Sequence, residues 1–171
     1  PTRRSSDLEW LKQLQPGKKI GVLGTISAFG SIWVNGLRIH YDNETPISID
    51  GRHTQPEQLA RGQRVLLTAQ RVKGQLIADQ IELLNSVIGP VSAVDRQEKR
   101  FTILGQQIQL SERTINALPA TRLPQLGEWL NVAGTRNASA TIEASYIEPT
   151  QAHQQQGKVL LRGQLRSSPL G

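Results

Sequence analysis

Most of the chain consists of one sequence pattern that occurs twice, and this duplication constrains the fold more than any other feature. Gly24-Thr25-Ile26-Ser27-Ala28 is matched 65 residues later by Gly89-Pro90-Val91-Ser92-Ala93. Gly62-Gln63-Arg64-Val65 is matched at the same offset by Gly127-Glu128-Trp129-Leu130. Because the anchors recur in one order at nearly one spacing, we predict two tandem copies of a single small domain.

The duplication divides the chain into two domains and two flanks. We assign residues 20–85 to repeat 1 and residues 86–150 to repeat 2. Residues 1–19 are predicted to be a tail, and residues 151–171 a flexible linker followed by the start of a truncated third repeat. The third repeat is inferred because residues 157–165 resemble residues 17–26, and a terminal strand is the alternative.

The beginning of the chain reads as an artefact. Residues 1–8 match the translation of a common sequencing adaptor in order, and the sequence contains no Met. We therefore interpret the chain as a fragment of a longer protein and leave these residues out of the fold.

The segment 30–42 is predicted to form a β-hairpin. Asn35-Gly36 is a strong signal for a two-residue type I′ turn, in which both residues need a positive φ. This turn pairs Val34 with Leu37, Trp33 with Arg38 and Ile32 with Ile39. Side chains alternate across a strand, so two faces follow. One face holds Ile32, Val34, Leu37, Ile39 and Tyr41, and the other holds Trp33, Arg38 and His40.

A short helical turn and a second hairpin complete the predicted repeat. Thr54 and Glu57 fit a capping box, and Gly62 fits the end of the turn. Segments 64–72 and 75–84 are predicted to be strands joined at Lys73-Gly74. The fold class is therefore all-β, with two tandem five-stranded OB-like barrels, each with at most one short helical turn. Repeat 2 follows the same plan, with turns at Leu104-Gly105 and Asn137-Ala138-Ser139.

The pattern of glycines and aliphatic residues resembles the bacterial domain-of-unknown-function family DUF5666. The resemblance spans residues 20–148 and departs where Pro124 replaces a leucine. It implies a β-barrel module that often occurs in tandem in exported proteins, and therefore a periplasmic or extracellular location. It implies no catalytic or ligand residues. The matching positions are Gly24, Ile26, Val34, Gly36, Ile39, Thr45, Leu59, Gly62, Val65, Ala78 and Ile81, and in repeat 2 Gly89, Val91, Ile103, Gly105, Ile108, Thr114, Gly127, Leu130, Ala144 and Ile147.

Composition and spacing give no sign of catalysis. The chain has no cysteine, which excludes disulfides, thiolate metal sites and cysteine nucleophiles. His40, His53 and His153 are not spaced as metal ligands, and the acidic residues are scattered singly. No apolar run approaches the ~20 residues that cross a bilayer. We expect no enzymatic activity, no cofactor and no metal.

The net charge of +6 suggests nucleic acid, but its distribution argues against that partner. Residues 20–85 hold six basic and six acidic side chains, and residues 86–150 again hold six of each. The excess lies in the flanks. Affinity for nucleic acid grows with the number of phosphates that the protein neutralises, so a barrel without net charge lacks the main contribution to that affinity.

The strongest candidate ligand site is the outer cluster of Trp33, Arg38 and His40. An aromatic ring beside a cation can stack on a sugar or a base. The alternative is a cross-strand cation–π pair that stabilises the hairpin, and Thr102 and Gln107 at the matching positions of repeat 2 favour it.

The sequence thus predicts a non-enzymatic β-repeat module of a bacterial exported or cell-envelope protein, with a role in binding, spacing or assembly. Its partner is an unidentified protein or envelope component. The alternatives are an OB-type nucleic-acid-binding protein and an accessory carbohydrate-binding domain.

Overall fold

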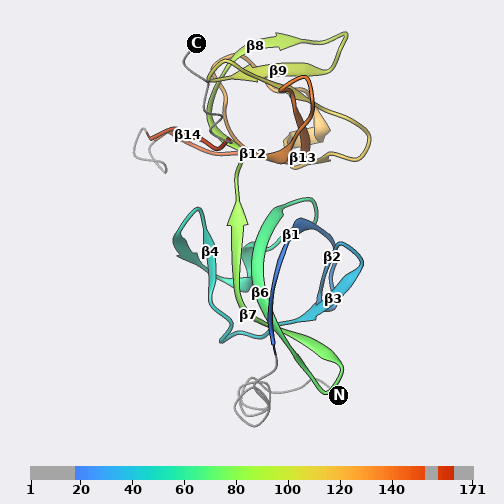
Figure 1. Cartoon of the computed structure of the whole chain (residues 1–171). Helices are drawn as coiled ribbons and strands as arrows, with labels where there is room; N and C mark the ends of the chain where they lie inside the picture. The colour runs from blue at the N-terminus through green and yellow to red at the C-terminus, as the bar shows by residue number, and fades with distance from the viewer. Residues whose placement is uncertain (1–17, 153–157, 164–171) are drawn as a thin grey trace, which may run out of the picture. The chain divides into compact units, whose positions relative to one another are not determined.

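The computed structural model describes residues 18–152 and 158–163, and the chain divides into two compact units between Leu84 and Asn85 (Figure 1). Residues 1–17, 153–157 and 164–171 lie outside the described part. The predictions made for the tail, for most of the linker and for much of the third repeat fall on those residues.

The first unit is a closed five-stranded barrel. β1 lies between β2 and β6, β6 pairs with β7, and a parallel β3–β7 pairing closes the ring. The strands of both units, with 3₁₀ turns as the helical segments among the described residues, confirm the predicted all-β class. The strands of this unit are β1 (Lys19–Ala28), β2 (Ile32–Val34), β3 (Leu37–His40), β4 (Ile47–Ile49), β5 (Arg52–Thr54), β6 (Arg64–Val72) and β7 (Gln75–Leu84).

The second unit repeats this order as a ring of five strands. β8 lies between β9 and β12, β12 pairs with β13, and a parallel β10–β13 pairing completes the ring. The strands of this unit are β8 (Val87–Asp95), β9 (Arg100–Ile103), β10 (Gln106–Gln109), β11 (Ile115–Asn116), β12 (Trp129–Arg136), β13 (Ile142–Pro149) and β14 (Leu160–Leu161). The more specific OB-like assignment stays a prediction.

The hairpins form with the predicted register. Ile32 lies opposite Ile39, and Trp33 lies opposite Arg38. The turn between β2 and β3 has positive φ at both central residues, 53° at Asn35 and 75° at Gly36, as a type I′ turn requires. Lys73-Gly74 and Leu104-Gly105 also have positive φ at both residues, so the same kind of turn joins hairpin strands in both units.

The predicted capping box is wrong. The helical segment of the first unit is a single 3₁₀ turn, Pro56–Gln58, with Gln55 at its N-cap and no side-chain cap. Thr54 instead ends β5, where it pairs with Ile47 of β4. The turn begins at Pro56, so the N-cap position falls on Gln55 and not on Thr54. Gly62 has a positive φ of 89° but follows the end of the turn by several residues.

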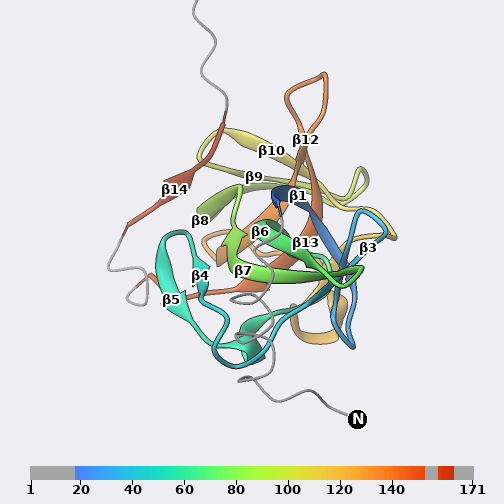
Figure 2. The ribbon, with the colours of Figure 1, turned by 60° about the horizontal axis from the view of Figure 1, so that its bottom comes forward.

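Four short strands of the described residues lie outside the two rings, and three of them, β4 (Ile47–Ile49), β5 (Arg52–Thr54) and β11 (Ile115–Asn116), were not predicted. β4 pairs with β7, and β5 pairs with β4. Figure 2 shows this β4–β5 hairpin to one side of the first barrel. In the second unit β11 pairs with β13. The segment predicted to begin a third repeat contains β14, which pairs with β8 of the second unit.

Each ring encloses its own aliphatic core. Ile32, Val34, Ile39 and Leu67 are completely buried in the first unit, and Ile103, Ile108 and Leu130 in the second. Within the described residues no helix is long or apolar enough to cross a membrane.

Candidate functional site

The outer face of the β2–β3 hairpin carries the residues that the sequence singled out. Trp33 and Arg38 lie opposite one another, and both side chains are exposed, Trp33 by 36%. His40 is half-buried on the same face. Their neighbours Ile32, Val34 and Ile39 point the other way into the core. The alternation of the strand therefore brings the three predicted residues together on one side.

Ser31 joins this cluster, although the sequence analysis did not select it. Arg38 Nε donates to Ser31 Oγ at 3.4 Å, and Ser31 Oγ lies 3.1 Å from His40 Nδ1. Ser31 is only 7% exposed, so its hydroxyl holds the two larger side chains in place. The period-two pattern puts Ser31 on the face of Trp33, but its burial depends on the folded barrel.

A bulge in β1 positions the backbone of Trp33. The register of β1 on β2 shifts between Ile26 and Ala28, and the Ser27 hydroxyl donates to the Trp33 carbonyl oxygen at 3.1 Å. The second unit repeats the arrangement, since the Ser92 hydroxyl donates to the Thr102 carbonyl oxygen at 3.2 Å. Both units thus hold this hairpin in the same way, but only the first presents an aromatic ring there.

The cluster is suited to binding. An exposed indole offers a flat apolar surface, and the guanidinium of Arg38 adds hydrogen-bond donors and a positive charge beside it. The described residues contain no group of three His, Asp or Glu side chains that could hold a metal ion. The arrangement can hold a planar ligand that has acceptor groups at its edge.

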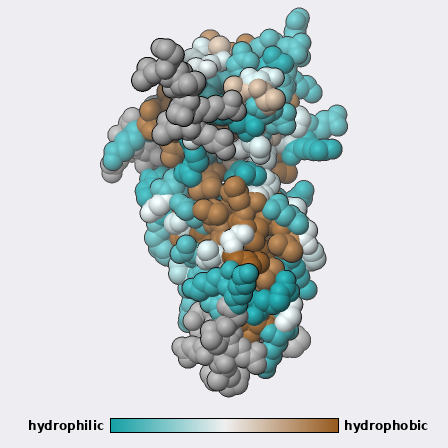
Figure 3. Space-filling model, in the orientation of Figure 1, coloured by the Kyte–Doolittle hydropathy of each residue, from teal (hydrophilic) through white to brown (hydrophobic). Residues whose placement is uncertain are grey.

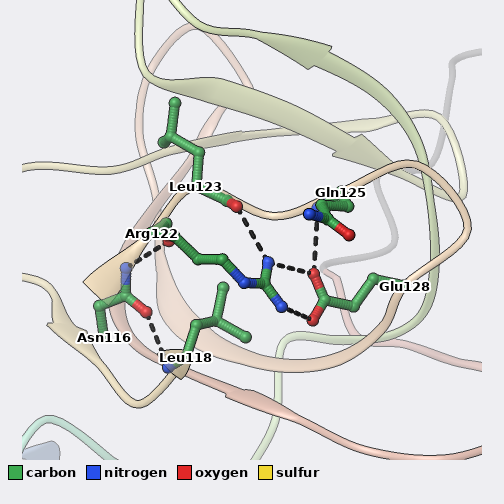
Figure 4. Close-up of polar contacts among 6 residues, drawn as sticks. All are labelled: Asn116, Leu118, Arg122, Leu123, Gln125 and Glu128. Carbon is green, nitrogen blue, oxygen red and sulfur yellow. Dashed lines mark hydrogen bonds and ion pairs between the residues drawn. The ribbon is translucent and has the colours of Figure 1, made fainter. Parts of the chain in front are cut away.

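A second polar cluster, in the loop between β11 and β12, has a structural role (Figure 4). Arg122 makes a bidentate ion pair with Glu128, with contacts of 2.9 and 2.6 Å. Glu128 also accepts a hydrogen bond from the Gln125 backbone N–H at 3.0 Å. Hydrogen bonds from the Arg122 guanidinium hold the pKa of the Glu128 carboxyl below its usual value.

The matching loop of the first unit explains this second cluster. Gln63, at the position of Glu128, accepts a hydrogen bond from the Ala60 backbone N–H at 2.7 Å and donates to Gln58 O at 3.1 Å. A neutral amide closes the loop in one unit, and a carboxylate with an arginine closes it in the other. The charged pair therefore substitutes for a structural hydrogen bond.

Asn116 completes the second loop. Its side-chain amide donates to the Arg122 carbonyl oxygen at 3.0 Å, and its oxygen accepts from the Leu118 backbone N–H at 2.9 Å (Figure 4). The same amide donates to the Thr121 carbonyl oxygen at 3.1 Å. All three contacts are to backbone atoms, so Asn116 also shapes the loop.

An open depression lies on the second unit, where the sequence predicted no site. It is lined by Gln109, Ser111, Glu112, Arg113 and Glu143. Two of these residues serve neighbouring backbone, since Gln109 donates to Glu98 O and Ser111 accepts from the Arg113 backbone N–H. Two of its five lining side chains are thus already bound to the backbone.

The fold and these clusters define a tandem β-barrel repeat protein, in which polar side chains organise loops around two aliphatic cores. The chain belongs to the family described as Domain of unknown function (DUF5666), whose model matches residues 20–82 and 88–148. Searches of curated proteins and of solved structures found no match to the chain.

Proposed function

We propose that the chain is a non-enzymatic binding and assembly module of a bacterial exported or cell-envelope protein. The proposal rests on the positions of the polar side chains in the two units. Aliphatic residues fill both barrels, and the clusters around Glu128 and Gln63 are used to close loops. What remains for recognition is the outer surface, where Trp33 and Arg38 stand together.

The location in the envelope is supported by the resemblance to a family whose members often occur in tandem in exported proteins. The balanced charges of the two repeats also fit a partner other than nucleic acid. The partner class is a protein or another envelope component.

Cosedimentation of the purified chain with washed bacterial envelopes tests the proposal. We expect the chain to sediment with the envelopes and to remain there as salt is raised. In parallel, binding to a fluorescent single-stranded oligonucleotide is measured across salt concentrations. Oligonucleotide binding with a steep salt dependence, or no envelope binding at all, would overturn the proposal.

A second candidate, an accessory carbohydrate-binding role, is favoured specifically by the exposed Trp33 ring. Electrophoresis in gels that contain soluble cell-wall polysaccharides measures it as retarded migration. Trp33→Ala should abolish the retardation, while Thr102→Ala, at the matching position of the second unit, should leave it unchanged. Equal retardation of both variants and the wild type would remove this candidate.

A further inference from the structure

The two units differ at the outer edge of their first strand. In the second unit, β14 pairs antiparallel with β8, and Leu160 lies opposite Ile88. The Arg162 backbone N–H extends the ladder with a 2.8 Å hydrogen bond to Ser86 O. Because hydrogen-bonded pairs alternate along an antiparallel ladder, the backbone groups of Ile88 also face β14.

The corresponding edge of the first unit is open within the described residues. Leu23 occupies the place of Ile88 at the repeat offset of 65. β6 pairs with one side of β1 from Lys19 to Thr25, and β2 joins the other side only at Ile26 and Ala28. No described strand lies along the outer side between Lys19 and Leu23.

This edge adjoins an exposed apolar surface. Leu23 is 52% exposed, and Leu66, its cross-strand partner on β6, is 42% exposed. Figure 3 shows apolar side chains gathered over this part of the first unit. By contrast, Ile88, with Leu160 paired to it, is only 2% exposed.

The side chain of Asn35 occupies part of this edge. Its amide donates to Leu23 O at 2.8 Å, so the backbone groups of Leu23 face away from β6. The second unit has Leu104 at this turn position, with nearly the same φ, 51° against 53°. A leucine cannot donate such a bond, and there β14 pairs with the strand instead.

We propose that the outer edge of β1 accepts an extended peptide segment with adjacent aliphatic residues, paired antiparallel as β14 pairs with β8. Addition of a strand to a sheet edge is a common mode of peptide recognition. The chemistry of the occupant follows from the sequence that fills the matching edge, Val159-Leu160-Leu161 between Lys158 and Arg162. The aliphatic side chains would cover Leu23 and Leu66.

Asn35 competes with the incoming strand for Leu23 O, and so weakens binding without blocking the edge. Gly21 leaves space beside it, because a Cβ built there would meet no atom within 4 Å. The inference uses the backbone edge of β1 and none of Trp33, Arg38 and His40, so it does not rest on the proposed ligand of that cluster.

The probe is a capped peptide with the sequence of residues 157–163, added to the whole chain. Amide hydrogen exchange, followed by mass spectrometry with fragmentation, reports strand addition directly. We expect slower exchange at Gly21 and Leu23, whose N–H groups face the open edge. The control peptide carries an N-methyl group on the Leu160 nitrogen, which removes the donor for Leu23 O but keeps the side chains.

Asn35→Leu, which copies the second unit, should tighten peptide binding by about 2- to 10-fold, as expected for the loss of one competing hydrogen bond. Asn35→Gly keeps the turn and should act in the same direction. Three outcomes would overturn the proposal: unchanged exchange in β1, equal protection by the N-methylated peptide, or protection confined to β8.

Discussion

The Asn35 side-chain amide donates a 2.8 Å hydrogen bond to Leu23 O and so ties the tip of the β2–β3 hairpin to β1. Asn35→Asp keeps the size of the side chain and its tolerance of positive φ but removes the donor. We expect the free energy of unfolding to fall by roughly 0.5–1.5 kcal/mol. Urea unfolding measures it, with Asn43→Asp in the exposed loop after β3 as the control. Equal stability of the two variants would show that the bond contributes nothing.

Gly24 is predicted to resist even the smallest side chain. A Cβ at this position would lie 2.6 Å from Val34 Cγ1 and would also contact the Asn35 side chain. Gly24→Ala should therefore destabilise the first unit by about 1–3 kcal/mol through overpacking. Gly21→Ala, three residues earlier in β1, should be well tolerated because that Cβ meets open space. Thermal unfolding of the pair measures the difference, and similar melting temperatures would contradict it.

Trp33 and Ile32 are neighbours in β2 that face opposite sides of the sheet. Ile32 is completely buried, so Ile32→Ala should cost about 2–5 kcal/mol by leaving a cavity. Trp33 is exposed and pairs across the strands with Arg38, so Trp33→Ala should cost only about 0.2–1 kcal/mol. Chemical denaturation of both variants checks the order. A larger loss at Trp33 would mean that its ring supports the fold rather than a ligand.

Glu128 makes the loop of the second unit sensitive to acid. The pKa of its carboxyl is lowered, chiefly by hydrogen bonding to Arg122. The contribution of this carboxylate to the free energy of unfolding is therefore complete above the ordinary glutamate pKa of about 4.3. That contribution is lost as pH falls through the lowered pKa. Glu128→Gln imitates Gln63 and should be less stable than the wild type at neutral pH, with a smaller difference in acid. Melting temperatures measured across acidic pH test this, and a constant difference would refute it.

Both tyrosines should remain protonated beyond the pH at which free tyrosine ionises. Burial raises the pKa of Tyr146, with a further contribution from Glu148, to which its hydroxyl donates at 3.0 Å. Burial also raises the pKa of Tyr41, with a further contribution from Glu57. Because the pKa values are raised in the folded state, the protonated tyrosines should contribute fully to the free energy of unfolding below about pH 10. That contribution should be lost as the pH rises further. Tyrosinate absorbance measures this, and half-titration at pH 10 in the folded protein would contradict it.

The sequence predicted most accurately what is settled by neighbouring residues. Asn35-Gly36 predicted both the turn and the register that sets Trp33 against Arg38. The capping box failed because Thr54 pairs with Ile47 in a short hairpin that turns at Asp50-Gly51, a local signal that the sequence analysis missed. The pairing of β4 with β7, by contrast, has no local signal. Ser31 was missed for a similar reason, since its contacts with Arg38 and His40 form only once the hairpin is folded.

The sequence by itself determined the duplication, the all-β class and the hairpin faces, because turn glycines and alternating aliphatic residues act through local geometry. Tertiary structure alone decided the parallel pairings that complete the rings, the pairing of β14 with β8, and the hydrogen bond from Asn35 to Leu23. These contacts join residues that are distant along the chain. Each forms only when the rest of the fold has brought its partners together, so no local pattern encodes it.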